Sequence, residues 1–155
     1  MKVFRISYCK YITDLSGIGA ARAGGRWNSE GVYVLYTAST ASLAMLETLA
    51  HLKSMPVTGL CITCLEVPDE ASVIIDELDL PSDWNTYPAP VVLQRIGDRH
   101  LKSNRFLSVQ LPSALLSEDK VILLNPNHPE FKRVKVVYTR PLAIDKRLYQ
   151  THERL

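Results

Sequence analysis

The chain has 155 residues, of which 46% are hydrophobic and 22% are charged, and its formal net charge at pH 7 is +2. This length suits one domain with a full hydrophobic core, and the composition is ordinary for a globular protein. A net charge this small argues against direct binding of nucleic acid or of an anionic membrane surface by this chain.

Two strands and a loop are predicted in the first part of the chain. Residues 2–7 alternate between apolar and polar side chains, which is typical of a strand with one buried face. Residues 16–25 are rich in Gly and Ala and predict a loop. Residues 31–37 are mostly β-branched and aromatic, so they predict a second, buried strand.

A helix is predicted next, because Ser39 or Thr40 can cap an N-terminus and the helical pattern continues to about Leu52. After a turn around Pro56, the apolar segment 60–67 predicts a further strand.

The second half of the chain predicts short strands around one helix. Residues 71–78 form a strand or part of a loop, and residues 91–104 form a helix. The apolar side of this helix is predicted from three residues: Val92, Ile96 and Leu101. Strands follow at 107–111, 121–124 and 133–138. Strands outnumber helices and do not alternate with them in βαβ units, so the sequence predicts a mixed α+β fold.

The cysteine content argues for a reducing compartment. Cys61 and Cys64 have the spacing of a redox pair, but residues three apart on a strand point to opposite faces, so these thiols should diverge. The three cysteines of the chain cannot supply the second pair that a zinc site would need. We therefore expect buried, reduced thiols and no metal.

A cytoplasmic location is also expected from the distribution of apolar residues. Met1 and Lys2 are not followed by the apolar stretch of a secretory leader. The segment 32–52 is interrupted by Glu47 and His51, so it does not predict a membrane-spanning helix.

Nucleotide- and metal-binding signatures of common type are incomplete. Gly17 and Gly19 resemble the start of a dinucleotide-binding loop, but Arg22 occupies the third glycine position and no clear strand leads into the motif. The histidines are scattered and do not suggest a metal site.

Glu47 is the most informative residue of the first helix, because no other charged residue lies between Glu30 and Lys53. An ionised carboxylate among apolar residues is costly unless it is paired or used in chemistry. On a helical projection it shares a broad face with four other residues: Leu43, Leu46, Ala50 and His51. The alternative is a buried ion pair with Arg26, Arg5 or Arg22.

Arg26 supplies a cation on a close-approach loop, because Gly24 and Gly25 precede it. A guanidinium group can grip phosphate bidentately, and Trp27 or Tyr36 can offer a flat face to a base or a nicotinamide ring. With Glu47 to stabilise positive charge on a ribose, these groups suit a dinucleotide whose glycosidic bond is to be broken.

Six sequence blocks together resemble the RES-domain family. They run in family order from residue 4 to about 131: Phe4-Arg5-Ile6, Gly24-Gly25-Arg26-Trp27-Asn28-Ser29, Val34-Leu35-Tyr36-Thr37-Ala38, Ser42-Leu43-Ala44-Met45-Leu46-Glu47, Leu111-Pro112-Ser113-Ala114 and Leu124-Asn125-Pro126-Asn127-His128-Pro129. The resemblance implies one RES-type, NAD-binding catalytic domain over residues 1–155, with a fold like that of ADP-ribosyltransferase toxins.

The same resemblance implies a bacterial toxin whose antitoxin is an Xre-type helix-turn-helix protein, with NAD as its substrate, and it leaves a homodimer open. It assigns catalytic roles to four residues: Arg26, Tyr36, Glu47 and Ser113. It assigns NAD binding to an overlapping set: Arg5, Arg26, Trp27, Tyr36 and Asn125.

Three questions stay open at the level of sequence. Water, phosphate or a protein can accept the ADP-ribose, and the last of these would make the protein an ADP-ribosyltransferase. A non-catalytic binding module would instead use Arg26 and Glu47 as a structural ion pair. Ser108 lies close to Ser113 in the chain and is the alternative functional serine.

Overall fold

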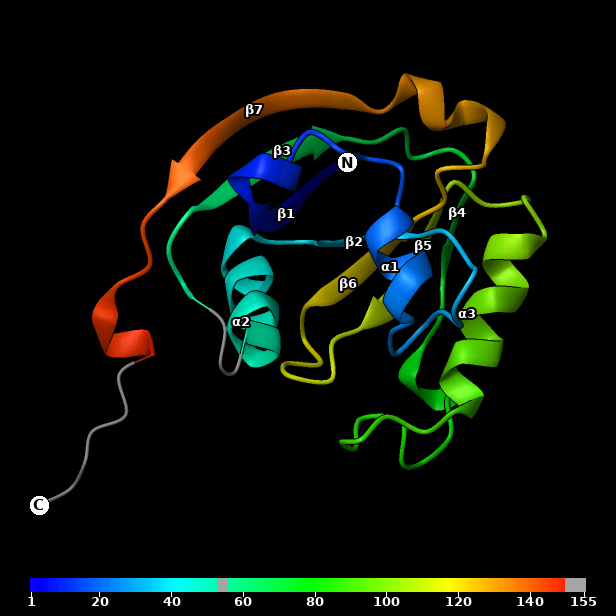
Figure 1. Ribbon diagram of the computed structural model, residues 1–155. Coiled ribbons are helices and arrows are strands. Elements are labelled where there is room, and N and C mark those ends of the chain that lie inside the picture. The colour runs from blue at the N-terminus through cyan, green and yellow to red at the C-terminus, as the bar shows by residue number, and fades with distance from the viewer. Residues whose placement is uncertain (53–55, 150–155) are drawn as a thin grey trace, which may run out of the picture.

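The computed structural model describes residues 1–52 and 56–149 and shows a twisted, seven-stranded sheet with helices packed around it (Figure 1). The strand order is β4-β5-β6-β2-β1-β3-β7. Neighbouring strands are antiparallel except β4 and β5, which are parallel. The strand bounds are β1 Lys2–Tyr8, β2 Leu35–Ala38, β3 Leu60–Glu66, β4 Ser72–Ile74, β5 Ser108–Pro112, β6 Lys120–Leu124 and β7 Lys135–Leu142. This architecture confirms the predicted mixed α+β fold.

The helices occupy different ends of the sheet. In Figure 1, α2 lies below β1 and β3, whereas α3 lies on the other side of the view, near β4. The α-helices are α1 Ile18–Ala23, α2 Ala41–Leu52 and α3 Val92–Lys102. Short 3-10 turns occur at Cys9–Tyr11, Glu77–Asp79, Pro129–Arg133 and Lys146–Leu148. Thr40 caps α2, since its Oγ1 accepts the Leu43 N–H at 3.0 Å.

Each face of the sheet carries its own hydrophobic core. The larger core joins the sheet to α2 and α3 and includes Trp27, Leu43, Trp84 and Leu93. The smaller core, on the other face, includes Val3 and Leu124 among its buried residues. β7 is an edge strand and contributes to neither core, because its residues are exposed from Lys135 to Pro141.

Two predicted segments differ from the structure. Residues 16–25 contain a helix rather than only a loop, because Gly17 and Gly24 adopt positive φ angles of 73° and 66° and bound an Ala-rich turn. The predicted strand 31–37 is shortened to β2, since Gly31 turns the chain at a φ of 87°. Val32 and Val34 are nevertheless buried, as part of the larger core.

The apolar side of α3 was predicted correctly except at one residue. Leu101 is buried and Ile96 packs against the larger core, as expected, whereas Val92 is 41% exposed. Leu93 and Gly97 are also buried. On α2, Leu46, Ala50 and His51 of the expected Glu47 face are exposed, whereas Leu43 is buried.

The cysteine prediction was half right. The side chains of Cys61 and Cys64 diverge on β3 as expected, and Cys64 is a free, buried thiol. Cys61, however, forms a disulfide with Cys9, which lies 52 residues away in sequence. The sequence spacing pointed to Cys64 as the neighbour, but the antiparallel pairing of β1 and β3 brings Cys9 beside Cys61 instead.

No helix within the described ranges 1–52 and 56–149 is both long and apolar enough to cross a membrane. In the same ranges, no group of three or more His, Cys, Asp or Glu side chains is arranged to hold a metal ion.

Candidate active site

Glu47 is held by Ser113. The Ser113 hydroxyl donates to Glu47 Oε1 at 2.8 Å, across 66 residues of sequence. Glu47 projects from α2, and Ser113 follows directly after β5, so the contact joins a helix to the end of a strand. The second carboxylate oxygen, Oε2, lies 3.9 Å from His51 Nε2, and the Glu47 side chain retains 27% of its exposure. One carboxylate oxygen is therefore fixed by Ser113, and the Glu47 side chain as a whole is partly exposed.

The hydroxyl group of Ser113 is fully engaged in hydrogen bonds within the protein. Its single hydroxyl proton goes to Glu47, and its oxygen accepts the N–H groups of Leu115 at 3.1 Å and Leu116 at 3.3 Å. The residue is only 1% exposed. The Ser113 hydroxyl is therefore placed to orient the Glu47 carboxylate.

Arg26 is anchored by backbone carbonyl groups instead of a carboxylate. It donates from Nη1 to the Trp84 carbonyl at 2.7 Å and from Nη2 to the Thr86 carbonyl at 3.1 Å. A guanidinium group has five N–H donors, and these two bonds engage two of them within the part of the chain that the structure describes. Partial burial lowers the pKa of Arg26, and the nearby charge of Glu47 opposes this shift. Among the described residues, Arg26 and Glu47 form no direct ion pair.

The hydroxyl of Tyr36 has a fixed direction. It donates to Asn28 Oδ1 at 2.8 Å and accepts the Trp27 N–H at 3.1 Å. Burial is the main reason why the pKa of Tyr36 is raised well above its ordinary value, so the phenol stays protonated. Because its proton is committed to Asn28, Tyr36 can offer a ligand only its remaining acceptor lone pair.

These residues act on one another electrostatically. The charges of Glu47 and Tyr36 raise the pKa of Arg26. The charge of Arg26 lowers the pKa of Tyr36, and that of Glu47 raises it. The structure thus brings together the four residues predicted to be catalytic. The arrangement offers a cation, an acceptor hydroxyl and a partly exposed carboxylate on one side of the sheet.

Two predicted NAD-binding residues lie elsewhere. Trp27 is 2% exposed and belongs to the larger core, so its ring cannot stack on a ligand. Arg5 alternates along β1 with Phe4 and Ile6, which pack against the larger core with Tyr36, so Arg5 points to the opposite face. There it donates to the Ile12 carbonyl at 2.9 Å.

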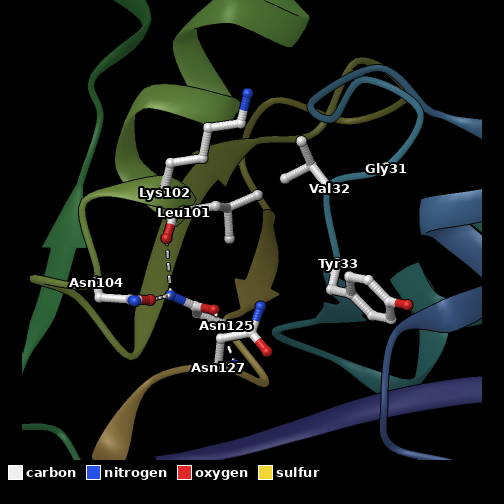
Figure 2. Close-up of a pocket in the computed structure, with 8 residues that line it drawn as sticks. All are labelled: Gly31, Val32, Tyr33, Leu101, Lys102, Asn104, Asn125 and Asn127. Carbon is white, nitrogen blue, oxygen red and sulfur yellow. Dashed lines mark hydrogen bonds between the residues drawn. The ribbon is translucent and has the colours of Figure 1, made fainter.

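Asn125 also lies outside this cluster. Its amide donates to the Leu101 carbonyl and to Asn104 Oδ1, both at 2.9 Å, and its oxygen accepts the Asn127 N–H at 3.0 Å. Figure 2 shows these contacts beside an open hollow of about 130 Å³. Asn125 is 1% exposed and ties the end of α3 to the turn after β6, which is a structural role.

Comparison with known proteins identifies the family, because residues 2–145 match the RES domain. The chain belongs to the RES domain family. This RES domain is 35% identical over 151 residues to Toxin Res of Yersinia enterocolitica, covering 96% of the chain and 99% of that relative. It is 37% identical over 140 residues to the Prs ADP-ribosylating toxin of Sphingobium sp. strain YBL2, covering 87% and 86% of the two chains.

Its fold is shared with a chain in the crystal structure of the M. tuberculosis MbcT–MbcA toxin–antitoxin complex. The TM-score is 0.73 at 18% identity, over 92% of this chain and 84% of the solved one.

The sequence interpretation of this RES domain missed several residues that support the site. Asn28 is fully buried, and its amide donates to the carbonyl groups of Ala20, Ser29 and Val32 while its oxygen orients Tyr36. Asp98 and Gln94 of α3 contact the Arg26 loop. The sequence did offer one signal of these contacts, which is the polar residue Asp98 on the buried side of α3.

Proposed function

We propose that this chain is the toxin of a bacterial toxin–antitoxin pair and that it depletes NAD by cleaving the nicotinamide–ribose bond. The observation that carries the proposal is the Glu47 carboxylate, which Ser113 holds at Oε1 on a side chain that is partly exposed. The names of the relatives, Toxin Res and Prs ADP-ribosylating toxin, support the same activity class.

Cleavage of this bond creates positive charge on the ribose. The bond between ribose C1′ and the nicotinamide nitrogen breaks with both electrons going to that nitrogen, so nicotinamide leaves as a neutral molecule. The ionised Glu47 would stabilise the oxocarbenium-like ribose, and its Oε2, which Ser113 does not bind, would accept a hydrogen bond from a ribose hydroxyl. The acceptor oxygen then bonds to C1′ and releases its proton to solvent.

Arg26 and Tyr36 would bind the substrate. The guanidinium group of Arg26 suits the pyrophosphate or the phosphate on the nicotinamide side. Tyr36 would accept a hydrogen bond from a donor on the nicotinamide ribose, since its own proton is held by Asn28. Ser113 would contribute indirectly, by keeping the Glu47 carboxylate in place.

Protein ADP-ribosylation is the second candidate, and the name of the Sphingobium relative favours it. Both reactions would use the same site and differ only in the acceptor. The third reading, a binding module built on an Arg26–Glu47 ion pair, loses its basis because the guanidinium group is hydrogen-bonded to carbonyl groups instead.

Product analysis tests the proposal. Purified protein is incubated with NAD, with and without inorganic phosphate, and the products are identified by chromatography and mass spectrometry. Free nicotinamide with ADP-ribose indicates water as acceptor, and ADP-ribose phosphate indicates phosphate. Labelling of an added protein acceptor without release of free ADP-ribose indicates the second candidate. No NAD turnover by a folded preparation would refute both.

An antitoxin partner is part of the proposal. The solved structure with the shared fold comes from a toxin–antitoxin complex, and the sequence resemblance points to an Xre-type helix-turn-helix protein. Co-expression of such a neighbouring protein should suppress both NAD loss and growth arrest. Unchanged toxicity in its presence would contradict this part.

A further inference from the structure

One face of α3 contacts every second residue of the segment that carries Arg26. Gln94 Nε2 donates to the Gly25 carbonyl at 3.0 Å, and Asp98 Oδ1 accepts the Ser29 N–H at 3.0 Å. Between them, Gly97 lies against the Trp27 carbonyl. The contacts therefore fall one residue before Arg26, one after it and three after it.

The spacing of these helical residues explains the arrangement. Positions i, i+3 and i+4 of a helix lie on the same face, so Gln94, Gly97 and Asp98 can reach the turn that carries Arg26 together. Gln94 supplies a donor and Asp98 an acceptor, so the two polar contacts are of opposite kind and fix the direction of the segment along the helix.

Gly97 is required by the closeness of the two backbones. A Cβ atom at this position would overlap the Trp27 carbonyl oxygen, which belongs to the backbone and cannot rotate away. Glycine inside a helix is less favourable than alanine. Its presence in the middle of α3 is accounted for by this approach, and any larger residue would push the Arg26 segment outward.

The same contacts reach the other site residues. Asp98 is near enough to influence Tyr36, since its charge contributes to the raised pKa of that phenol. At the far end of the side chain, the guanidinium group of Arg26 is held by Trp84 and Thr86, in the segment that leads into α3. Arg26 is thus fixed at its backbone by α3 and at its tip by the residues preceding α3.

We propose that Gln94, Gly97 and Asp98 are positioning residues that set the location of Arg26 for substrate binding. This inference rests on the proposed function, because the substrate is taken to be NAD. The three residues would not touch the substrate. They would act by holding the backbone on both sides of Arg26, so that its guanidinium group faces the ligand without reorganisation.

Two variants test the inference, each with a matched control. Gln94→Met keeps size and helix propensity but removes the donor, and Arg95→Met makes a comparable change on the exposed side of the same helix. Gly97→Ala forces the backbones apart, whereas Gly19→Ala adds a Cβ in α1 where no atom lies within 4 Å.

Kinetics give the first readout. We expect Gln94→Met to raise the KM for NAD roughly tenfold with a smaller change in kcat. Gly97→Ala should lower kcat/KM about 100-fold, since a misplacement of about 1 Å can have that effect. Both controls should remain within twofold of the original protein. In an Arg26→Ala background, Gln94→Met should have no further effect, because its influence passes through Arg26.

Amide hydrogen exchange gives a readout that does not depend on activity. In Gln94→Met, the amides of Gly25, Trp27 and Ser29 should exchange at least tenfold faster, while those of β5 and β6 keep their rates. Unchanged exchange in this segment would overturn the inference, and so would kinetic effects that multiply in the Arg26→Ala background. Absence of NAD turnover in the original protein would refute the proposed function alone, since the exchange experiment would still test the positioning role.

Discussion

Replacing Ser113 with alanine separates the orientation of Glu47 from its charge. The change removes a 2.8 Å hydrogen bond to the carboxylate and leaves the Leu115 and Leu116 N–H groups without their shared acceptor. The carboxylate itself remains, so any loss of activity in Ser113→Ala measures how far its position contributes.

The magnitude follows from the kind of bond that is lost. A hydrogen bond to a charged group contributes about 1.5–3 kcal/mol, which corresponds to a fall in kcat of roughly 10- to 100-fold. Stability should also fall by about 1–3 kcal/mol, because water replaces the serine oxygen only in part. For a chain of this size, that lowers Tm by roughly 2–10 °C.

Ser108→Ala is the matched control, because Ser108 is also 1% exposed and its hydroxyl donates to Ser72 Oγ at 2.9 Å. It should lose a similar amount of stability and keep its NAD turnover. Both variants are assayed for NAD consumption at a temperature well below their Tm. If Ser113→Ala keeps kcat within twofold, or if Ser108→Ala loses as much activity, the orienting role of Ser113 is refuted.

Three further substitutions test the other site residues. Glu47→Gln keeps the acceptor for Ser113 but removes the charge, so NAD turnover should fall by about 10²–10³-fold with little change in Tm, and a mutant that melts early yet keeps its activity would contradict the catalytic role. Arg26→Lys cannot hold two carbonyl groups and still present a fork to phosphate, so the KM for NAD should rise at least about tenfold, and an unaltered KM would contradict phosphate binding. Tyr36→Phe should remove part of the loss of stability at alkaline pH. Because burial raises the pKa of Tyr36 above its ordinary value of 10.0, the folded state keeps a proton that the unfolded chain releases, so this stabilisation is complete below about pH 10 and lost above it. Urea unfolding at pH 8 and pH 10.5 measures the difference, and an identical pH dependence in the two proteins would refute it.

Local patterns were sufficient for most strands and for the α2 cap, because alternation and capping depend on residues close in sequence. The same is true of Glu47, whose charge stands out within an apolar helix. The failures involve distant partners. Trp27 seemed available for stacking until the sheet and α3 buried it, and Arg5 was assigned to the site although its strand turns it to the other face.

The supporting contacts of the site could not be predicted for the same reason. Gln94 and Asp98 meet the Arg26 loop across 69 residues of sequence, and Ser113 meets Glu47 across 66. Such pairs depend on the sheet order and on the rotation of α3. The apolar pattern found Ile96 and Leu101 but not the buried Gly97, which is not a large apolar residue.

The position of β6 in the sheet has a consequence for the moment at which the site first exists. β6 lies between β2, which carries Tyr36, and β5, which leads into Ser113. These two side chains therefore take up their relative positions only after residues 120–124 have been inserted between the two strands. A nascent chain that ends before this point has Arg26, Tyr36, Glu47 and Ser113 in its sequence but lacks the frame that assembles them. At a synthesis rate of about 5–20 residues per second, several seconds separate the appearance of Arg26 from that of β6. The four side chains are thus not held together until β6 has been made, which is late in the synthesis of the chain.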